Sequence, residues 1–244
     1  MRYLDCTYPE IAGHAANGWL ALVPMGCTEQ QGPHLAVGFD TWFAEELLTA
    51  ASHQAAALHH VNSLVLPALP FGPTPEHRGY RSGYVDLPPA VHDAVCDAIL
   101  VSLAEQGFSR LVIWRGCGGH DLRDVVEQFN RDWQGRAQAF LPEPPLHQIW
   151  CRVADPAVPG GHADSFTTSI ALHRNPELVR LDRIPGPSES PVDWSDPALD
   201  FTVYSSSGVI GDPRHGSAEL GAALWSECIA WTVDLLRQIA SDDR

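Results

Sequence analysis

Short apolar runs alternate along the chain with longer segments whose apolar residues recur every three or four positions. The short runs predict buried strands, at 19–24, 63–69 and 109–114, with 147–153 as a candidate fourth. The longer segments predict helices, at 41–60, 89–106, 121–133, 164–173 and 217–239. This alternation predicts one α/β domain over residues 1–244, with a mostly parallel central sheet and helices on both faces.

A polar cluster follows the first predicted strand. Its loop carries Glu29, Gln31 and His34, and Asp40 follows near the start of the next helix. Two carboxylates and a histidine in a loop shaped by Gly and Pro could hold a divalent metal. Asp is also a common residue at a helix start, so from the spacing alone capping of the next helix is the stronger explanation. The spacing alone leaves both interpretations open.

A second polar cluster follows the third predicted strand. Trp114 and Arg115 end that strand, and Gly-Cys117-Gly-Gly-His120 comes next. Glycines at this place let the backbone approach a ligand, or simply form a tight turn into a helix. Because ligands of parallel sheets bind where strands end in loops, we expect both clusters at one edge of the sheet.

Two further clusters contain histidine. His162 stands two residues before Asp164, a candidate helix cap, and is a candidate general acid or base. A helix start disfavours a charged imidazole, so we expect a mostly neutral His162 at pH 7. We also expect His162 to be required for catalysis and dispensable for folding. Glu76 and His77 form a weaker pair between the second strand and the second helix.

The composition of the chain limits the classes of partner and the chemistry that we expect. The formal net charge of −15 argues against nucleic acid and anionic membranes, which both need a basic face. All basic residues are arginine, which excludes lysine chemistry such as a Schiff base. Six cysteines without a paired framework, and no apolar signal segment, indicate a reduced, cytoplasmic protein.

These clusters, in this order, resemble the motifs of the creatininase (creatinine amidohydrolase) family, from about residue 19 to residue 240. The family pattern P-x-G-S-x-E-Q-H-G-P-H-L-P-x-x-T-D stands here as Pro24 to Asp40. Its N-G-H-G-G-N stands as Arg115 to His120, and its H-A-G-E-x-E-T-S as His162 to Ser169. The family's terminal G-V-x-G-D-P stands as Gly208 to Pro213.

The resemblance implies a two-metal amidohydrolase in which Glu29 and Asp40 match metal ligands, with Asp40 in the bridging role. Three other ligand positions differ: Gln31 and Cys117 stand where the family has histidine, and Thr167 where it has glutamate. Two close cations would then lack the negative charge that offsets their repulsion. We therefore expect at most one divalent metal (zinc, manganese or iron), or none, on Glu29, Asp40 and Cys117.

The resulting prediction is an enzyme that acts on the C–N bond of a small amide, lactam or cyclic amide, as a step in specialised metabolism. The candidate catalytic residues are His162, His120 and Glu29. The candidate substrate-binding residues are His34, Gln31, Glu76, His77, Trp114, Arg115 and Asp164. Two alternatives remain: a ligand-binding homologue without activity, and a conventional hydrolase with a rebuilt one-metal site. The resemblance also implies a homo-oligomer, a hexamer in the family.

Overall fold

A computed structural model describes residues 1–119 and 121–241 of the chain. Its strands are β1 (Leu20–Met25), β2 (Ser63–Val65), β3 (Arg110–Arg115) and β4 (Gln138–Phe140). Its α-helices are α1 (Tyr8–Ala16), α2 (Phe39–His59), α3 (Pro89–Glu105), α4 (Arg123–Asp132), α5 (Leu146–Ala154), α6 (Ser165–Arg174) and α7 (Ala218–Ala240). The five predicted helices agree with α2, α3, α4, α6 and α7 to within two residues at each end.

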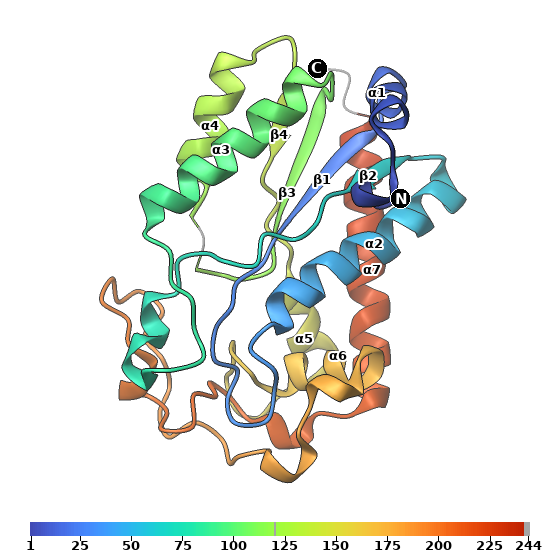
Figure 1. Ribbon diagram of the computed structural model, residues 1–244. Helices are drawn as coiled ribbons and strands as arrows, with labels where there is room; N and C mark the ends of the chain where they lie inside the picture. The colour runs from blue at the N-terminus through green and yellow to red at the C-terminus, as the bar shows by residue number, and fades with distance from the viewer. Residues whose placement is uncertain (120, 242–244) are drawn as a thin grey trace.

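The four strands form one sheet in the order β2-β1-β3-β4, and every neighbouring pair is parallel. Alternate residues of the central strands face opposite sides. Leu22 and Val112 pack with α2, α5, α6 and α7, whereas Val23 and Ile113 pack with α1, α3 and α4. In Figure 1 α3 and α4 lie on one side of the strands, and α2 and α7 lie on the other. The predicted parallel α/β sandwich is confirmed.

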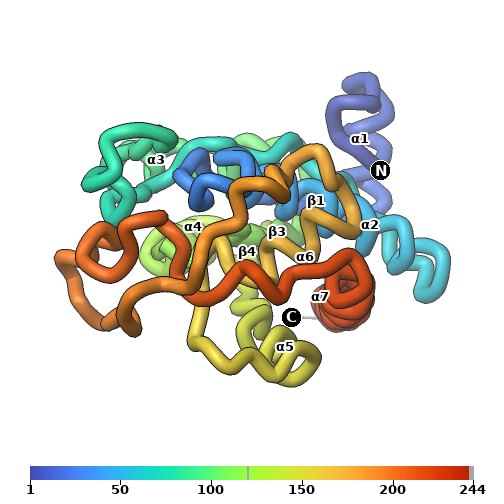
Figure 2. The backbone as a smooth tube through the Cα atoms, turned by 90° about the horizontal axis from the view of Figure 1, so that it is seen from below, coloured from blue at the N-terminus to red at the C-terminus, as the bar shows by residue number. Residues whose placement is uncertain are grey.

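The carboxyl ends of β1 and β3 lie at the same edge of the sheet, because the strands are parallel neighbours and Met25 pairs with Arg115. In Figure 1 the loop that follows β1 lies below the sheet, at the same end of the molecule as α6. Figure 2 looks at this end of the molecule, where the segment before α7 crosses the same region. The expected meeting of the two strand-end clusters is therefore confirmed.

The prediction of a strand at 147–153 is wrong, because this segment forms helix α5. Ile149 and Trp150 are buried, whereas the flanking His147, Gln148, Cys151 and Arg152 are exposed. This burial on one side matches helical periodicity. In a sequence run of only seven residues, helical periodicity cannot be distinguished from that of a strand. The predicted strand 63–69 is shortened to Ser63–Val65. Leu66 still donates its backbone N–H to Leu22, but Ala68 donates to Glu45 Oε2 instead of to β1.

Two elements were not predicted. Helix α1 begins with a capping box, in which Glu10 Oε2 accepts a hydrogen bond from the backbone N–H of Thr7 at 2.7 Å. The T-x-x-E spacing could have revealed it. Strand β4 has three residues and pairs only with β3, so its sequence carries too little periodicity to detect.

None of the helices among residues 1–119 and 121–241 has the length and apolarity that a membrane span requires.

Candidate active site

A cavity of about 480 Å³ opens at the carboxyl edge of the sheet, within the range of small-molecule sites. Its wall is built from the loops after β1 and β3 and from the starts of α2, α5 and α6. It has an acidic and polar side, formed by Glu29, Gln31, Asp40, Glu76, Cys117, His162, Asp164 and Thr167. It has an apolar side, formed by Phe39, Phe43, Leu146, Trp150, Phe166, Trp194, Leu199 and Phe201.

Glu29 lies at the centre of the polar side and is buried. Its Oε1 atom lies 3.4 Å from His77 Nε2 and 3.4 Å from His162 Nδ1. Its Oε2 atom lies 3.5 Å from Cys117 Sγ. Burial opposes ionisation of Glu29, but the hydrogen bond from His77 and the adjacent His162 outweigh it and lower its pKa to about 2. Glu29 is therefore a buried carboxylate.

The pKa of Asp40, in the first turn of α2, shifts in the opposite direction to that of Glu29. Burial and the charge of Glu29 raise the pKa of Asp40 well above its usual range. Its Oδ2 atom lies 2.7 Å from Gln31 Nε2, which donates to it, and 3.2 Å from Cys27 Sγ. The N-cap of α2 is Gly38, so Asp40 does not cap the helix. Its side chain belongs to the cavity instead.

Gln30 fixes the protonation pattern of the two histidines that flank Glu29, that of His77 through its side chain and that of His162 through its backbone oxygen. Gln30 Oε1 accepts from the backbone N–H of Gly32 at 2.9 Å, and its Nε2 donates to the backbone oxygen of Gly208 at 3.0 Å. These two bonds settle which end of the amide is nitrogen. His77 Nδ1, 3.0 Å from Gln30 Nε2, must then accept. His77 therefore carries its proton on Nε2, facing Glu29.

His162 has the complementary arrangement. Its Nε2 atom lies 2.6 Å from the backbone oxygen of Gln30 and must donate to it. Burial, and then the proximity of His77, lower the pKa of His162 to about 4, so the ring is neutral at pH 7. The prediction of a neutral His162 is confirmed, although burial rather than the helix start is the main cause. Its unprotonated Nδ1 faces the Glu29 carboxylate, and two acceptors so placed attract a proton donor or a cation between them.

The backbone around His162 is held on both sides. His162 and Ile210 exchange backbone hydrogen bonds of 3.3 and 2.9 Å across an antiparallel bridge. The next residue, Ala163, adopts a left-handed conformation with φ 52°, which is uncommon for a residue with a side chain and clusters at functional sites. Asp164 then caps α6 by accepting from the N–H of Phe166 at 2.8 Å. Burial raises the pKa of Asp164 to about 6.

The cavity brings together Glu29, Gln31, Asp40, Glu76, Cys117, His162 and Asp164, and His77 lies directly behind Glu29. Burial raises the pKa of Glu76. Their roles in catalysis, binding and metal coordination stay predictions. The prediction that His120 is catalytic concerns a residue outside those that the structure describes.

Three other candidates lie away from the cavity wall. His34 is fully buried, its Nε2 lies 2.9 Å from Thr168 Oγ1, and burial lowers its pKa to about 4. Trp114 packs in the core, with its ring centre 5.9 Å from that of Trp231. Arg115 points toward Glu143, with 3.8 Å between guanidinium and carboxylate. All three residues were predicted from sequence motifs. The direction of a side chain, which a motif does not give, decides whether the residue reaches a cavity.

Sequence reasoning missed two groups at the site. Cys27 and Gln30 stand inside the first motif, yet no role was predicted for them. The aromatic wall was missed because Trp150, Trp194 and Phe201 come from distant segments without a shared pattern. The Trp194 ring lies so close to Gly161 that a Cβ added there would stand 2.7 Å from it. Only the folded chain brings these rings beside His162.

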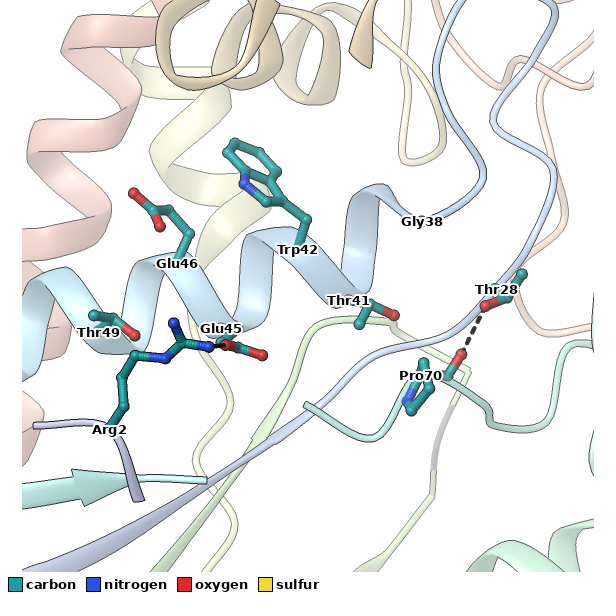
Figure 3. A pocket seen from close by; sticks show the side chains of 9 residues that line it. All are labelled: Arg2, Thr28, Gly38, Thr41, Trp42, Glu45, Glu46, Thr49 and Pro70. Carbon is teal, nitrogen blue, oxygen red and sulfur yellow. Dashed lines mark hydrogen bonds and ion pairs between the residues drawn. The ribbon is translucent and has the colours of Figure 1, made fainter. Parts of the chain in front are cut away.

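A second cavity of about 390 Å³ lies along α2, outside the region described above. Figure 3 shows that Arg2 reaches across it to Glu45, at 3.0 Å, and that Thr28 donates to the backbone oxygen of Pro70. Among its described lining residues there is no histidine or cysteine. It therefore lacks the pairing of histidine with a buried carboxylate that the first cavity has, and the first cavity is the candidate active site.

Gly208 is expected to be essential for the position of Gln30. A Cβ at Gly208 would lie 2.0 Å from Gln30 Oε1, and its φ of 87° is unfavourable for any other residue. Gly208→Ala should lower the free energy of unfolding by about 1–3 kcal/mol, measured by urea denaturation. Gly13→Ala, at a position with no atom within 4 Å, is the control and should be neutral or slightly stabilising. An equally stable Gly208→Ala would contradict the described packing.

Both the sequence and the fold of this chain are similar to those of known proteins. A profile of the creatininase family, described as creatinine amidohydrolase, matches residues 4–236. A mycofactocin precursor peptide peptidase of Mycolicibacterium smegmatis is 27% identical over 229 residues, covering 91% of this chain and 86% of the relative. A creatinine amidohydrolase of Pseudomonas putida is 26% identical over 256 residues, covering 96% and 95%. A mutant creatininase structure described as "Zn-Zn type" matches with a TM-score of 0.84 at 20% identity, covering 97% and 96%.

Proposed function

The chain belongs to the creatininase family, and from that premise we propose that it hydrolyses the C–N bond of an amide or cyclic amide. The observation that carries the proposal is the unprotonated His162 Nδ1 beside the Glu29 carboxylate, at 3.4 Å, on the wall of the cavity. A water that donates one hydrogen to each of these acceptors would be oriented and ready to lose a proton.

His162 supplies the proton transfers in this proposal. Its Nδ1 accepts a proton from the attacking water and returns it to the nitrogen that leaves. The hydrogen bond from Nε2 to the backbone oxygen of Gln30 holds the ring and stabilises its charged form between the two transfers. Glu29, ionised beside it, stabilises the same charge. Burial and the charge of Glu29 raise the pKa of Asp40 well above its usual range, which opposes a second negative charge beside Glu29.

The two-metal centre implied by the family does not fit this cavity. Gln31 donates its amide hydrogen to Asp40 at 2.7 Å, and Thr167 donates its hydroxyl to the backbone oxygen of Asp164 at 3.1 Å. Both residues are neutral, so neither supplies the negative charge that two close cations need. Gln31 Oε1 is buried without a hydrogen-bond partner among the described residues, and it could offer only one uncharged oxygen. A single divalent cation does fit, because Cys117 and Glu29 offer ligand atoms on one wall. When bound there, it would polarise the amide carbonyl as a Lewis acid.

The cavity favours a neutral or cationic substrate with a flat apolar part. Its described lining contains four carboxyl side chains and neither arginine nor lysine, so it offers no partner for a carboxylate or phosphate. The apolar part of its lining is largely aromatic and suits ring-shaped groups. Because relatives of this chain are named peptide peptidases, the amide could belong either to a small molecule or to a short peptide.

Hydrolysis can be tested by incubating the purified protein with creatinine, neutral lactams, N-acyl amines and short peptides in heavy-oxygen water. Mass spectrometry should detect cleavage or ring opening, with one heavy oxygen in the new carboxyl group. The alternative of a non-catalytic ligand-binding homologue predicts saturable binding of one of these amides without turnover. That outcome would contradict the proposal.

A further inference from the structure

Two cysteines lie at equivalent positions beyond the two central strands. Met25 of β1 pairs with Arg115 of β3, and Cys27 and Cys117 each follow two residues later. Each is preceded by a glycine with little room: a Cβ at Gly26 would stand 2.4 Å from Thr41 Cα, and one at Gly116 would stand 2.8 Å from the backbone oxygen of Asp40. Both strand ends therefore approach the start of α2 closely, and the two thiols meet there.

The thiols share this place with carboxylates. Cys27 Sγ, a carboxylate oxygen of Glu29 and Cys117 Sγ all lie within 4.8 Å of one another. Asp40 Oδ2 lies 3.2 Å from Cys27 Sγ on the same side. Around a tetrahedral zinc ion with Zn–S bonds of about 2.3 Å, two sulfur atoms stand roughly 3.8 Å apart. Small shifts of these side chains are enough to reach that spacing.

A competing set of ligands, Glu29, His77 and His162, lies on the other side of the same carboxylate. The orientation of Gln30 weakens it. Because Gln30 Nε2 donates to His77 Nδ1, the proton of His77 sits on Nε2, the atom that faces Glu29. To bind a metal through Nε2, His77 would have to move its proton to Nδ1 and lose the hydrogen bond from Gln30, which weakens this set. The cysteine set keeps three, and Asp40 can provide a fourth.

We propose that Cys27 and Cys117, with Glu29, hold a single divalent cation and make this a sulfur-ligated site that selects zinc over manganese. Thiolates favour zinc, whereas manganese prefers oxygen ligands. Each thiol gives up its proton to solvent as it binds the cation. Glu29 contributes one oxygen, and its other oxygen continues to face His77 and His162. The inference rests on the proposed active site, because it names the residues that hold the cation there.

Cobalt(II) titration of chelator-treated protein tests this inference without a substrate. Sulfur ligands give a near-ultraviolet charge-transfer absorption whose intensity rises with the number of thiolates. We expect one cobalt ion per chain with a two-thiolate intensity. Cys27→Ser and Cys117→Ser should each lose roughly half of it, and the double variant all of it. Cys6→Ser, a half-buried cysteine near the N-terminus, is the control and should keep the full intensity.

If a variant does not fold, zinc-edge X-ray absorption of the wild-type protein tests the inference instead. Two sulfur neighbours at about 2.3 Å are expected. Absence of sulfur, cobalt binding without the absorption band, failure of both metals to bind, or a Cys27–Cys117 disulfide that resists reductant would each overturn the inference. None of these outcomes excludes amide hydrolysis, so the cation site and the hydrolytic activity can be refuted independently.

Discussion

Replacement of His162 by asparagine is expected to lower kcat/KM for the amide substrate by about 10²–10⁴-fold, the usual contribution of a positioned acid–base group. Asparagine has no nitrogen that can accept and return a proton at the place of Nδ1. The loss should fall on kcat rather than on KM, because substrate binding depends on the aromatic wall. Steady-state kinetics, corrected for the folded fraction, measure this effect.

The same variant should also be less stable, which revises the expectation that His162 is dispensable for folding. His162 Nε2 donates to the buried backbone oxygen of Gln30 at 2.6 Å, and loss of that donor costs about 1–3 kcal/mol. His92→Asn is the matched control, since His92 is also buried but lies on α3, against the other face of the sheet. It should lose stability with turnover per folded molecule unchanged. Unchanged turnover in His162→Asn would remove His162 from the mechanism.

Restoration of the family ligands should raise the metal content from at most one ion per chain to two. The triple variant Gln31→His, Cys117→His and Thr167→Glu adds two imidazoles and one carboxylate. All three positions line the same cavity as Glu29 and Asp40. The added negative charge offsets the repulsion between two close cations, which the wild-type site cannot do. Plasma mass spectrometry after equilibrium dialysis measures the stoichiometry.

A matched control keeps the shape of the rebuilt site and removes its charge. The variant with Gln31→His, Cys117→His and Thr167→Gln should bind at most one ion, because glutamine supplies no negative charge. If the triple variant with glutamate folds and gains no ion, the alignment of these three positions with the family motifs is incorrect.

The fold was largely predictable because its strongest signals are local. The central strands β1 and β3 are buried on both faces, and their sequences are continuous apolar runs. The long helices repeat apolar residues at helical spacing. The errors fall where those signals are short: β4 has three residues, and α5 carries its buried face on Ile149 and Trp150 alone.

The site was predictable in part, for a different reason. Strand topology alone brings the loop of Glu29 to that of Cys117, so those two could be expected to meet. The positions of Gln30 and Trp194 depend on side-chain orientation and on contacts with residues more than thirty positions away, such as Gly208 and Gly161. No local pattern encodes such contacts. The same dependence explains why His34 and Trp114, both in motifs, turn away from the cavity.

The most direct test of this account is the number of metal ions in the wild-type protein. Purified protein, dialysed mildly and analysed by plasma mass spectrometry against its molar concentration, should retain at most one divalent ion per chain. Gln31 and Thr167, which donate hydrogen bonds to Asp40 and Asp164, are neutral and supply no charge to offset the repulsion of a second cation. Two ions per chain would contradict the account of a family site reduced to a single cation.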